Sequence, residues 1–257
     1  MKLYAGTSGF SYKGWTGSFY PEGLPAGEML RYYAGRLPAV EINNTFYRAP
    51  REGLLAEWAE QVPAGFRFAL KASRWITHMK RLGVAAPDVD LLLRQAGALG
   101  ERQGPILFQL PPNFKVDLPR LQAFLELLPR DVLAAFEFRH ASWAKPAVRA
   151  ALQARGCALC IVDAGEEPAP ALEATAEWGY LRPRRENYDP AALAAWAERI
   201  AGQPWNAAYV FFKHETAEGP RLAASFLALA AARGEAIRGG CAACRGARSR
   251  SRSLPDG

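Results

Sequence analysis

Short apolar runs recur along the chain, and longer segments with the periodicity of amphipathic helices separate them. The runs are almost continuous in hydrophobic residues, which is typical of parallel strands buried on both faces. Eight strands are predicted in this way: Lys2–Gly6, Ala39–Ile42, Arg67–Lys71, Pro105–Gln109, Leu133–Phe138, Ala158–Val162, Trp178–Leu181 and Ala207–Phe212.

The segments between these strands place apolar residues three and four positions apart, so each segment has one apolar face. Residues 164–176, between the sixth and seventh strands, contain Pro168 and Pro170. Because proline removes a backbone donor and clashes with the preceding turn, we expect the helix there to be short or missing. Elsewhere seven helices are predicted, over residues 26–36, 51–60, 88–102, 119–128, 146–155, 190–201 and 220–233.

This alternation predicts an α/β fold with a parallel sheet. For 257 residues, a single (β/α)8 TIM-like barrel with parallel strands and outer helices is favoured over a doubly wound open sheet. The chain lacks GxGxxG and GxxxxGK(S/T), which argues against dinucleotide-binding and P-loop proteins. We expect the barrel to occupy residues 1–236 and the Gly/Ser/Arg-rich residues 237–257 to form a disordered tail.

Composition narrows the class of protein further. Half of the residues are hydrophobic, so the chain can bury a large core. No apolar run reaches the roughly 18 residues of a membrane span, and Met1–Gly9 lacks the apolar stretch of a secretory signal, so a cytoplasmic location is expected. The net charge is +7, of which residues 239–257 supply +3. This net positive charge permits an anionic small molecule or a nucleic acid as partner, and it does not favour one over the other.

The four cysteines predict no metal site. Cys157 and Cys160 lie three positions apart at a predicted strand, so they point to opposite faces and are expected in the core. Cys241 and Cys244 form one CxxC pair, which is only half of a zinc site without a second pair or histidines. We expect that pair to be reduced and dispensable.

Polar residues gather where the predicted strands end. In barrels, the carboxyl ends of the strands and the loops that follow them form the functional site. All three histidines of the chain, His78, His140 and His214, follow a predicted strand. This placement favours a functional rim, although loops carry polar residues in any protein.

Six cations lie at or just beyond strand ends: Lys71, Arg139, Arg182, Arg184, Arg185 and Lys213. Arginine can bind a phosphate or carboxylate through two N–H groups, and lysine supplies a compact charge. The last three follow the seventh and eighth strands, where barrels often hold phosphate. The alternative for Arg139 and Arg182 is that they only pair with carboxylates inside the barrel mouth.

Three carboxylates, Glu41, Glu137 and Asp163, belong to the second, fifth and sixth strand ends. Two carboxylates across a barrel mouth can act as general acid and base, and structural ion pairs are the alternative. His140 or His214 would act as the general acid or orient it, because histidine titrates near neutral pH.

Histidines and carboxylates together also raise the question of a divalent metal. The chain lacks HxxxH and HxH spacings, and the cations at the same rim would repel a metal ion, so neither a metal nor a cofactor is expected. Aromatic residues near the rim could stack on a sugar or base, but packing within the loops is favoured. They are Phe10, Tyr12, Trp15, Phe46, Tyr47, Trp75 and Trp143.

Seven segments carry a family resemblance: GTSGFSYKGW, VEINNTFYR, FALKASRWITH, FQLPPNF, FEFRHASW, YLRPRRENY and FFKHE. In this order, between residue 3 and about residue 232, they resemble the motifs of the DUF72, or YecE-like, family. The resemblance implies a TIM barrel and no assigned activity. The motif positions that it implies are Ser8, Glu41, Asn43, Thr45, Phe46, Tyr47, Lys71, His78, Gln109, Glu137, Arg139, His140, Trp143, Asp163, Arg182, Lys213 and His214.

We therefore expect an anionic small molecule, such as a phosphorylated sugar, a nucleotide or a carboxylate, to bind at the mouth of the barrel. A nucleic-acid-binding or nucleic-acid-processing protein is one alternative, and a non-catalytic scaffold is another. The expected catalytic residues are Glu41, Glu137, His140, His214 and Asp163. The expected binding residues are Ser8, Asn43, Thr45, Tyr47, Lys71, His78, Gln109, Arg139, Trp143, Arg182, Arg184 and Lys213.

Overall fold

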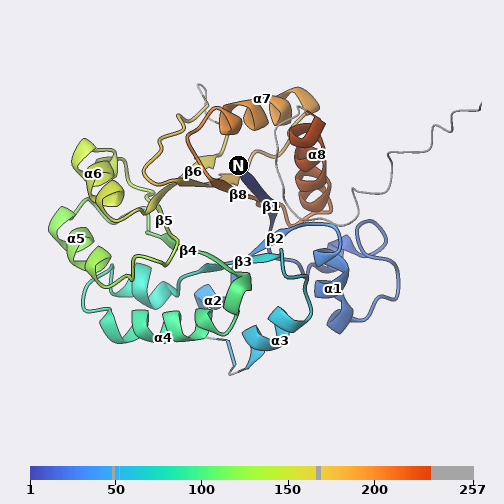
Figure 1. Cartoon of the computed structure of the whole chain (residues 1–257), viewed down its shortest axis with the longest axis horizontal. Helices are drawn as coiled ribbons and strands as arrows, with labels where there is room; N and C mark the ends of the chain where they lie inside the picture. Colours follow the sequence, from blue (N-terminus) through green and yellow to red (C-terminus); the bar gives the residue numbers. More distant parts are fainter. Residues whose placement is uncertain (48–49, 52, 166–168, 233–257) are drawn as a thin grey trace, which may run out of the picture.

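The computed structural model describes residues 1–47, 50–51, 53–165 and 169–232, without the side chains of Phe46 and Tyr47. Eight parallel strands close into a barrel in chain order (Figure 1). The barrel is closed because β1 pairs with β8, from Lys2 opposite Ala207 to Thr7 opposite Phe212. The strands are β1 (Lys2–Ser8), β2 (Ala39–Ile42), β3 (Arg67–Lys71), β4 (Gln103–Gln109), β5 (Ala134–Glu137), β6 (Ala158–Asp163), β7 (Trp178–Pro183) and β8 (Ala207–Phe212).

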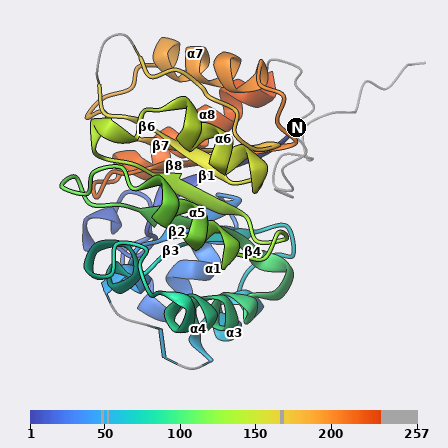
Figure 2. The ribbon, with the colours of Figure 1, turned by 90° about the vertical axis from the view of Figure 1, so that its left-hand side faces the viewer.

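Helices cover the outside of the barrel (Figures 1 and 2). They are α1 (Met29–Ala34), α2 (Asn44–Tyr47), α3 (Leu54–Glu60), α4 (Ala86–Gly97), α5 (Leu118–Glu126), α6 (Pro146–Ala154), α7 (Pro190–Ala201) and α8 (Glu218–Ala232). Short 3-10 turns are η1 (Lys13–Trp15), η2 (Ala26–Glu28), η4 (Gly100–Arg102) and η5 (Ala141–Trp143), and η3 (Trp75–Met79) is a π-helix. In the described part of the β6–β7 connection there is no helix, as Pro170 led us to expect.

The (β/α)8 barrel predicted from the sequence is thus confirmed, and the open sheet is excluded. Each of the eight predicted strands is present, with ends shifted by two residues at most. Residues 237–257, which were expected to form a disordered tail and which include Cys241 and Cys244, lie outside the described residues. Among the described residues, no helix has the length and apolar character needed to cross a bilayer.

Local signals in the sequence set where the outer helices begin. α5 and α7 both start with an aspartate followed by a proline within the first turn. The Asp117 carboxylate accepts a hydrogen bond from the Arg120 backbone N–H at 3.1 Å, and Asp189 does the same for Ala192 at 2.7 Å. Such caps satisfy backbone donors that have no partner inside the helix.

The barrel interior is a packed core below the mouth. Alternate residues of each strand point inward, because side chains in a strand alternate between its two faces. Aromatic rings from β1, β7 and β8 pack with mostly smaller residues from the other strands, and Tyr4 stacks on Tyr209 with ring centroids 4.9 Å apart. The interior residues are Tyr4, Ala39, Ala69, Leu107, Ala135, Ala158, Cys160, Trp178, Tyr180, Tyr209 and Phe211.

The two described cysteines are free and buried on different sides of the sheet. Cys160 belongs to the barrel interior, whereas Cys157 packs in the outer core between strands and helices. The prediction that they face opposite sides and serve as core residues is confirmed.

Candidate functional site

A polar layer closes the top of the barrel interior, at the carboxyl ends of the strands. Its members continue the inward alternation of β1, β2, β3, β4, β5, β7 and β8. They are Ser8, Glu41, Lys71, Gln109, Glu137, Arg182 and Lys213. All seven were predicted from the sequence as site residues, and the topology of a closed barrel brings them to one end.

Arg182 links the two glutamates in the centre of this layer. Its Nη2 lies 2.9 Å from Glu41 Oε1, and its Nη1 lies 2.6 Å from Glu137 Oε2. The side chains are almost fully buried, with 1% of Arg182 and none of Glu41 exposed. Removing three charges from water costs several kcal/mol per ion, so the fold tolerates them only because the pairs are close and well bonded.

Neutral side chains complete the hydrogen bonding of both carboxylates. Ser8 Oγ donates to Glu41 Oε1 at 2.7 Å, and the Tyr180 hydroxyl donates to Glu41 Oε2 at 2.7 Å. Gln109 Nε2 donates to Glu137 Oε1, also at 2.7 Å. Each carboxylate oxygen therefore has at least one donor, which fixes the layer as a rigid base for the mouth.

This bonding makes Glu41 and Glu137 stronger acids and weaker bases than ordinary carboxyl groups. Burial by itself raises the pKa of each carboxyl, but the charge of Arg182 and the surrounding hydrogen bonds outweigh it and hold both pKa values below the ordinary value. A carboxylate whose pKa is lowered in this way removes protons poorly near neutral pH. The structural ion pair considered in the sequence analysis is thus present for both glutamates, with Arg182 as the partner.

Three further cations lie around the buried triad. Arg184 Nη2 is 3.4 Å from both oxygens of Glu137. Burial lowers the pKa of Lys71 to about 8, with Arg182 and Lys213 adding to the effect and the two glutamates opposing it. The pKa of Arg184 and that of Lys213 are lowered too, first by burial and then by neighbouring cations. The mouth thus holds four cations against two buried carboxylates.

Several polar atoms at this end have no hydrogen-bond partner among the described residues. They include Nε of Arg182 and Nε of Arg184, which are buried donors, and Oδ1 of Asn43. Asn43 uses its other side-chain atom, Nδ2, to donate to Glu41 Oε1 at 3.2 Å. Buried polar groups are normally bonded, so unused donors beside a cation cluster are places where an anionic group can gain hydrogen bonds.

His78 belongs to the edge of the same cation cluster. It sits in the π-helix η3, and its Nδ1 lies 2.9 Å from Thr77 Oγ1. Burial and the charges of Lys71 and Arg139 lower its pKa, so the neutral imidazole is favoured at pH 7. Thr45 supports Lys71 from behind, because its hydroxyl donates to the Lys71 carbonyl at 2.8 Å.

Asp163 and His214 lie outside the polar layer, and their hydrogen-bond partners do not belong to it. Asp163 Oδ2 accepts hydrogen bonds from the Tyr188 hydroxyl and Trp196 Nε1, both at 2.9 Å, and Arg185 Nε donates to Oδ1 at 2.8 Å. His214 Nε2 lies 2.6 Å from the Arg185 carbonyl. The structure therefore does not bring these two predicted residues together with Glu41 and Glu137.

The loop after β5 places its predicted residues differently. Arg139 is exposed, while Trp143 is buried, stacked on Phe138 and bonded through Nε1 to the Phe114 carbonyl at 2.7 Å. Trp143 is thus a packing residue. His140 Nδ1 accepts from the Ser142 backbone N–H at 3.1 Å, so the neutral ring carries its proton on Nε2.

Two tyrosines differ from the other site residues in how sequence and structure compare. The side chain of Tyr47 lies outside the described residues. Tyr180, whose hydroxyl binds Glu41, was not predicted as a site residue. It lies two positions before Arg182 on β7, so the period of two would have placed both side chains on the inner face.

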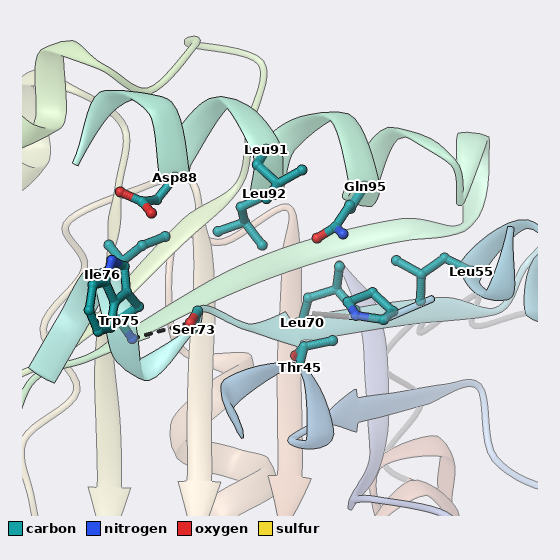
Figure 3. Close-up of a pocket in the computed structure, with 11 residues that line it drawn as sticks. Thr45, Leu55, Leu70, Ser73, Trp75, Ile76, Asp88, Leu91, Leu92 and Gln95 are labelled. Atoms are coloured by element: carbon teal, nitrogen blue, oxygen red, sulfur yellow. Dashed lines mark hydrogen bonds between the residues drawn. The ribbon is translucent and has the colours of Figure 1, made fainter. Parts of the chain in front are cut away.

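Two cavities outside the barrel are also lined by described residues. One, of about 90 Å³, lies between α4 and the β3–η3 segment, where Leu91, Leu92 and Gln95 face Leu70 and Thr45 (Figure 3). A larger one, of about 490 Å³, lies between β5, β6 and α6, near Arg139 and His140. Within the part of the chain that the structure describes, no three His, Cys, Asp or Glu side chains are grouped to hold a metal ion.

Comparisons with known proteins place the chain among proteins without a known role. A family model described as "Protein of unknown function DUF72" matches residues 4–244. The resemblance carried by the seven motifs ends near residue 232, whereas this match continues to residue 244 and so includes Cys241 and Cys244.

Among curated proteins, the chain is 34% identical over 112 residues to the UPF0759 protein YecE of Escherichia coli, covering 43% of this chain and 41% of that one. It is 25% identical over 153 residues to the UPF0759 protein YunF of Bacillus subtilis, covering 56% and 53%. The chain thus spans about half the length of the curated relatives it matches.

Solved structures of similar fold come from the same family. A DUF72 family protein from Thermotoga maritima superposes with a TM-score of 0.76 at 26% identity, over 89% of this chain and 99% of that one. One from Enterococcus faecalis superposes with a TM-score of 0.74 at 20% identity, over 89% and 95%. These likenesses agree with the barrel described above.

Proposed function

The chain belongs to the DUF72 family of proteins of unknown function, and for this member we propose that the mouth of the barrel binds a small anionic molecule. Phosphate esters and carboxylates are the chemical classes that this mouth would hold. Arg184, Lys71 and Lys213 would contact the anionic group, and the Glu41–Arg182–Glu137 triad would form the floor beneath it.

One observation carries this proposal. Burial lowers the pKa of each of these three contacting cations, and the charge of Arg182 adds to the effect while nearby glutamates oppose it. The surroundings of these cations therefore favour an added negative charge. An anion placed among them would relieve the repulsion from Arg182 and use donors such as Arg184 Nε, which has no partner among the described residues.

The buried triad supports a small ligand that stays in the mouth. Aromatic rings fill the barrel below it, so no space continues downward. The two glutamates make their shorter contacts, of 2.9 and 2.6 Å, with Arg182, and Glu137 also lies 3.4 Å from Arg184, so a bound anion would share Arg184 with Glu137. The triad has two negative charges and one positive charge, so the three further cations give the mouth as a whole a net positive charge, which suits one compact anionic group.

The test is ligand-induced stabilisation of the full-length protein. Inorganic phosphate, sulfate, sugar phosphates, nucleotides and short single-stranded oligonucleotides are added at low salt, and the melting temperature is recorded. A ligand at about 100 times its Kd stabilises the fold by about 2.7 kcal/mol, which raises Tm by roughly 5–10 °C for a domain of this size.

Variants locate the site of any stabilisation. Arg184→Ala and Lys213→Ala should each weaken binding of the stabilising anion at least tenfold. Lys2→Ala is the matched control, because Lys2 is an exposed lysine at the opposite end of the barrel. Stabilisation by no small anion, or equal stabilisation in all variants, contradicts the proposal. Stabilisation only by oligonucleotides, lost at high salt, would instead support a nucleic-acid-binding protein.

A further inference from the structure

Among the lysines of strands β1–β8, as far as the structure describes them, Lys71 is the one at a carboxyl end, because Lys2 lies at the amino end of β1. It ends β3, it is mostly buried, and its backbone is held by the Thr45 hydroxyl at 2.8 Å. It lies within electrostatic range of Arg182, Lys213, Glu41 and Glu137. A lysine on a fixed strand, among the charged groups of the mouth, is more restrained than the mobile lysines on the surface.

Compared with the glutamates and arginines of the mouth, the Lys71 amine is the better base and nucleophile. Glu41 and Glu137 are engaged by Arg182 and are weak bases. Arg182 and Arg184 keep their charges under all ordinary conditions. Burial lowers the pKa of Lys71 to about 8, so a sizeable fraction of its Nζ is neutral at pH 7.5. A neutral, partly desolvated lysine amine beside another cation is the form that attacks carbonyl carbons.

We propose that Lys71 Nζ forms a covalent imine with a carbonyl compound that carries a phosphate or carboxylate group. This inference rests on the proposed function, because Arg184 and Lys213 would hold the anionic group and thereby bring the carbonyl to Nζ. The substrate class is therefore an anionic aldehyde or ketone rather than an anion in general.

The step balances without any oxidant or reductant. The Nζ lone pair forms a bond to the carbonyl carbon, and the π electrons of the C=O bond move to oxygen. Both hydrogens of the neutral amine then leave with that oxygen as water, and the C=N bond remains.

Pyridoxal 5′-phosphate is a suitable probe, because it combines an aldehyde with a phosphate. The full-length protein is incubated with it at pH 7.5, imines are reduced with borohydride, and the modified lysines are identified by peptide mass spectrometry. We expect Lys71 to be modified at least tenfold faster than the exposed Lys13, Lys115 and Lys145, because each unit of lowered pKa raises the neutral fraction by about tenfold. Pyridoxal, which lacks the phosphate, should lose most of this preference.

Two variants and a pH profile make the test specific. Lys71→Arg keeps a cation but cannot form an imine, so the preferred label should disappear while the melting curve shows a folded protein. Lys145→Arg is the matched control and should leave labelling of Lys71 unchanged. The labelling rate at Lys71 should level off above pH 8, whereas the rates at exposed lysines should continue to rise to about pH 10.

The possible failures are distinguishable. If phosphate stabilises the protein but Lys71 is labelled no faster than the exposed lysines, the imine proposal is overturned and anion binding stands. If phosphate and the other small anions give no stabilisation and Lys71 shows no preferred labelling, both proposals are overturned. Preferred labelling by pyridoxal as well as by its phosphate would overturn the role assigned to the anionic group.

Discussion

Arg182 is the residue on which the mouth of the barrel depends. It is the only cation that pairs with both buried glutamates among the described residues, and it donates to each at less than 3 Å. Burial by itself lowers the pKa of the Arg182 guanidinium, but the charges of Glu41 and Glu137 outweigh burial and raise this pKa above its already high ordinary value. Losing it would leave two negative charges buried without an adequate partner.

Substitution of Arg182 should therefore unfold the protein more easily. We expect Arg182→Met to lower the free energy of unfolding by about 3–5 kcal/mol at pH 7, measured by urea denaturation. Arg31→Met is the control, because Arg31 forms an exposed pair with Glu28 and should change stability by less than about 1 kcal/mol. A loss below 1 kcal/mol for Arg182→Met would show that the triad is not a structural centre.

Lys71 should have the opposite effect on stability. Its pKa is lowered from 10.5 to about 8 in the folded protein, so between these values the unfolded chain binds more protons than the folded chain, and stability rises with pH. Below pH 8 the buried charge destabilises the fold. Lys71→Met should thus be more stable than the natural protein at pH 7, by about 1–3 kcal/mol.

The difference in the free energy of unfolding between the natural protein and Lys71→Met should shrink as pH rises from 8 toward 10.5. Urea denaturation at intervals over this range measures it, and subtracting the curve of Lys71→Met removes the contributions of tyrosines and other lysines. Lys2→Met should follow the natural protein throughout. Parallel stability curves for the natural protein and Lys71→Met would show that Lys71 carries no burial penalty.

At the scale of elements, the sequence predicts the barrel because its strands are short apolar runs bounded by prolines, glycines and charges. Residues 190–201 are predicted and observed as a helix with the same bounds, since Asp189 and Pro190 mark its start. The predicted helix over residues 26–36 is instead a 3-10 turn followed by α1. α2 and the π-helix η3 were not predicted, because both are too short to show a period.

The candidate site can be predicted from the sequence where the alternation of inward and outward residues along a strand is taken into account. Lys71 ends β3, and Glu41 and Arg182 each lie one residue before the end of a strand. All three are on the inner face, and the structure places them together. Asp163 is one residue out of phase, because Cys160 and Val162 are the inward residues of β6. His214 likewise follows the inward Lys213 by one position. Counting alternate positions along each strand would have separated these two from the polar layer.

In its observed position, Asp163 stabilises the fold through buried hydrogen bonds. Its carboxylate joins the end of β6 to α7 through Tyr188 and Trp196, whose polar atoms are buried. Asp163→Ala should lower the free energy of unfolding by about 2–4 kcal/mol, because it leaves these donors without an acceptor. The affinity of the mouth for phosphate, measured on the folded variant, should change less than twofold.

Asp189→Ala is a useful comparison for that measurement, since it removes only an exposed helix cap and should cost about 1 kcal/mol. Loss of anion affinity in Asp163→Ala, with its stability preserved, would reverse the assignment and place Asp163 in the functional site.

For the whole molecule, anion binding should be linked to proton uptake. The anion favours protonated Lys71, whose pKa is about 8 in its absence, so affinity should be constant well below pH 8 and fall as pH rises above it. Sulfate is the appropriate probe because its charge does not change over this range. Calorimetric titration should show affinity about tenfold weaker at pH 9.5 than at pH 7.

Titrations in buffers with different heats of ionisation give the number of protons directly. Near pH 8 we expect a fraction of a proton to be taken up for each sulfate bound, and none at pH 6. Affinity that stays level from pH 7 to 9.5 would argue that the anion binds away from Lys71.

The pairing of β1 with β8 also determines when this protein can fold during its synthesis. β1 leaves the ribosome before the other strands of the barrel, but its partner β8 begins only at Ala207. At about 5–20 residues per second, β1 waits roughly 10–40 s for that partner. Throughout this time one edge of β1 is unpaired and the apolar faces of the other strands lack their closing neighbour. The nascent chain is thus most open to aggregation and to chaperone binding until β8 has been made.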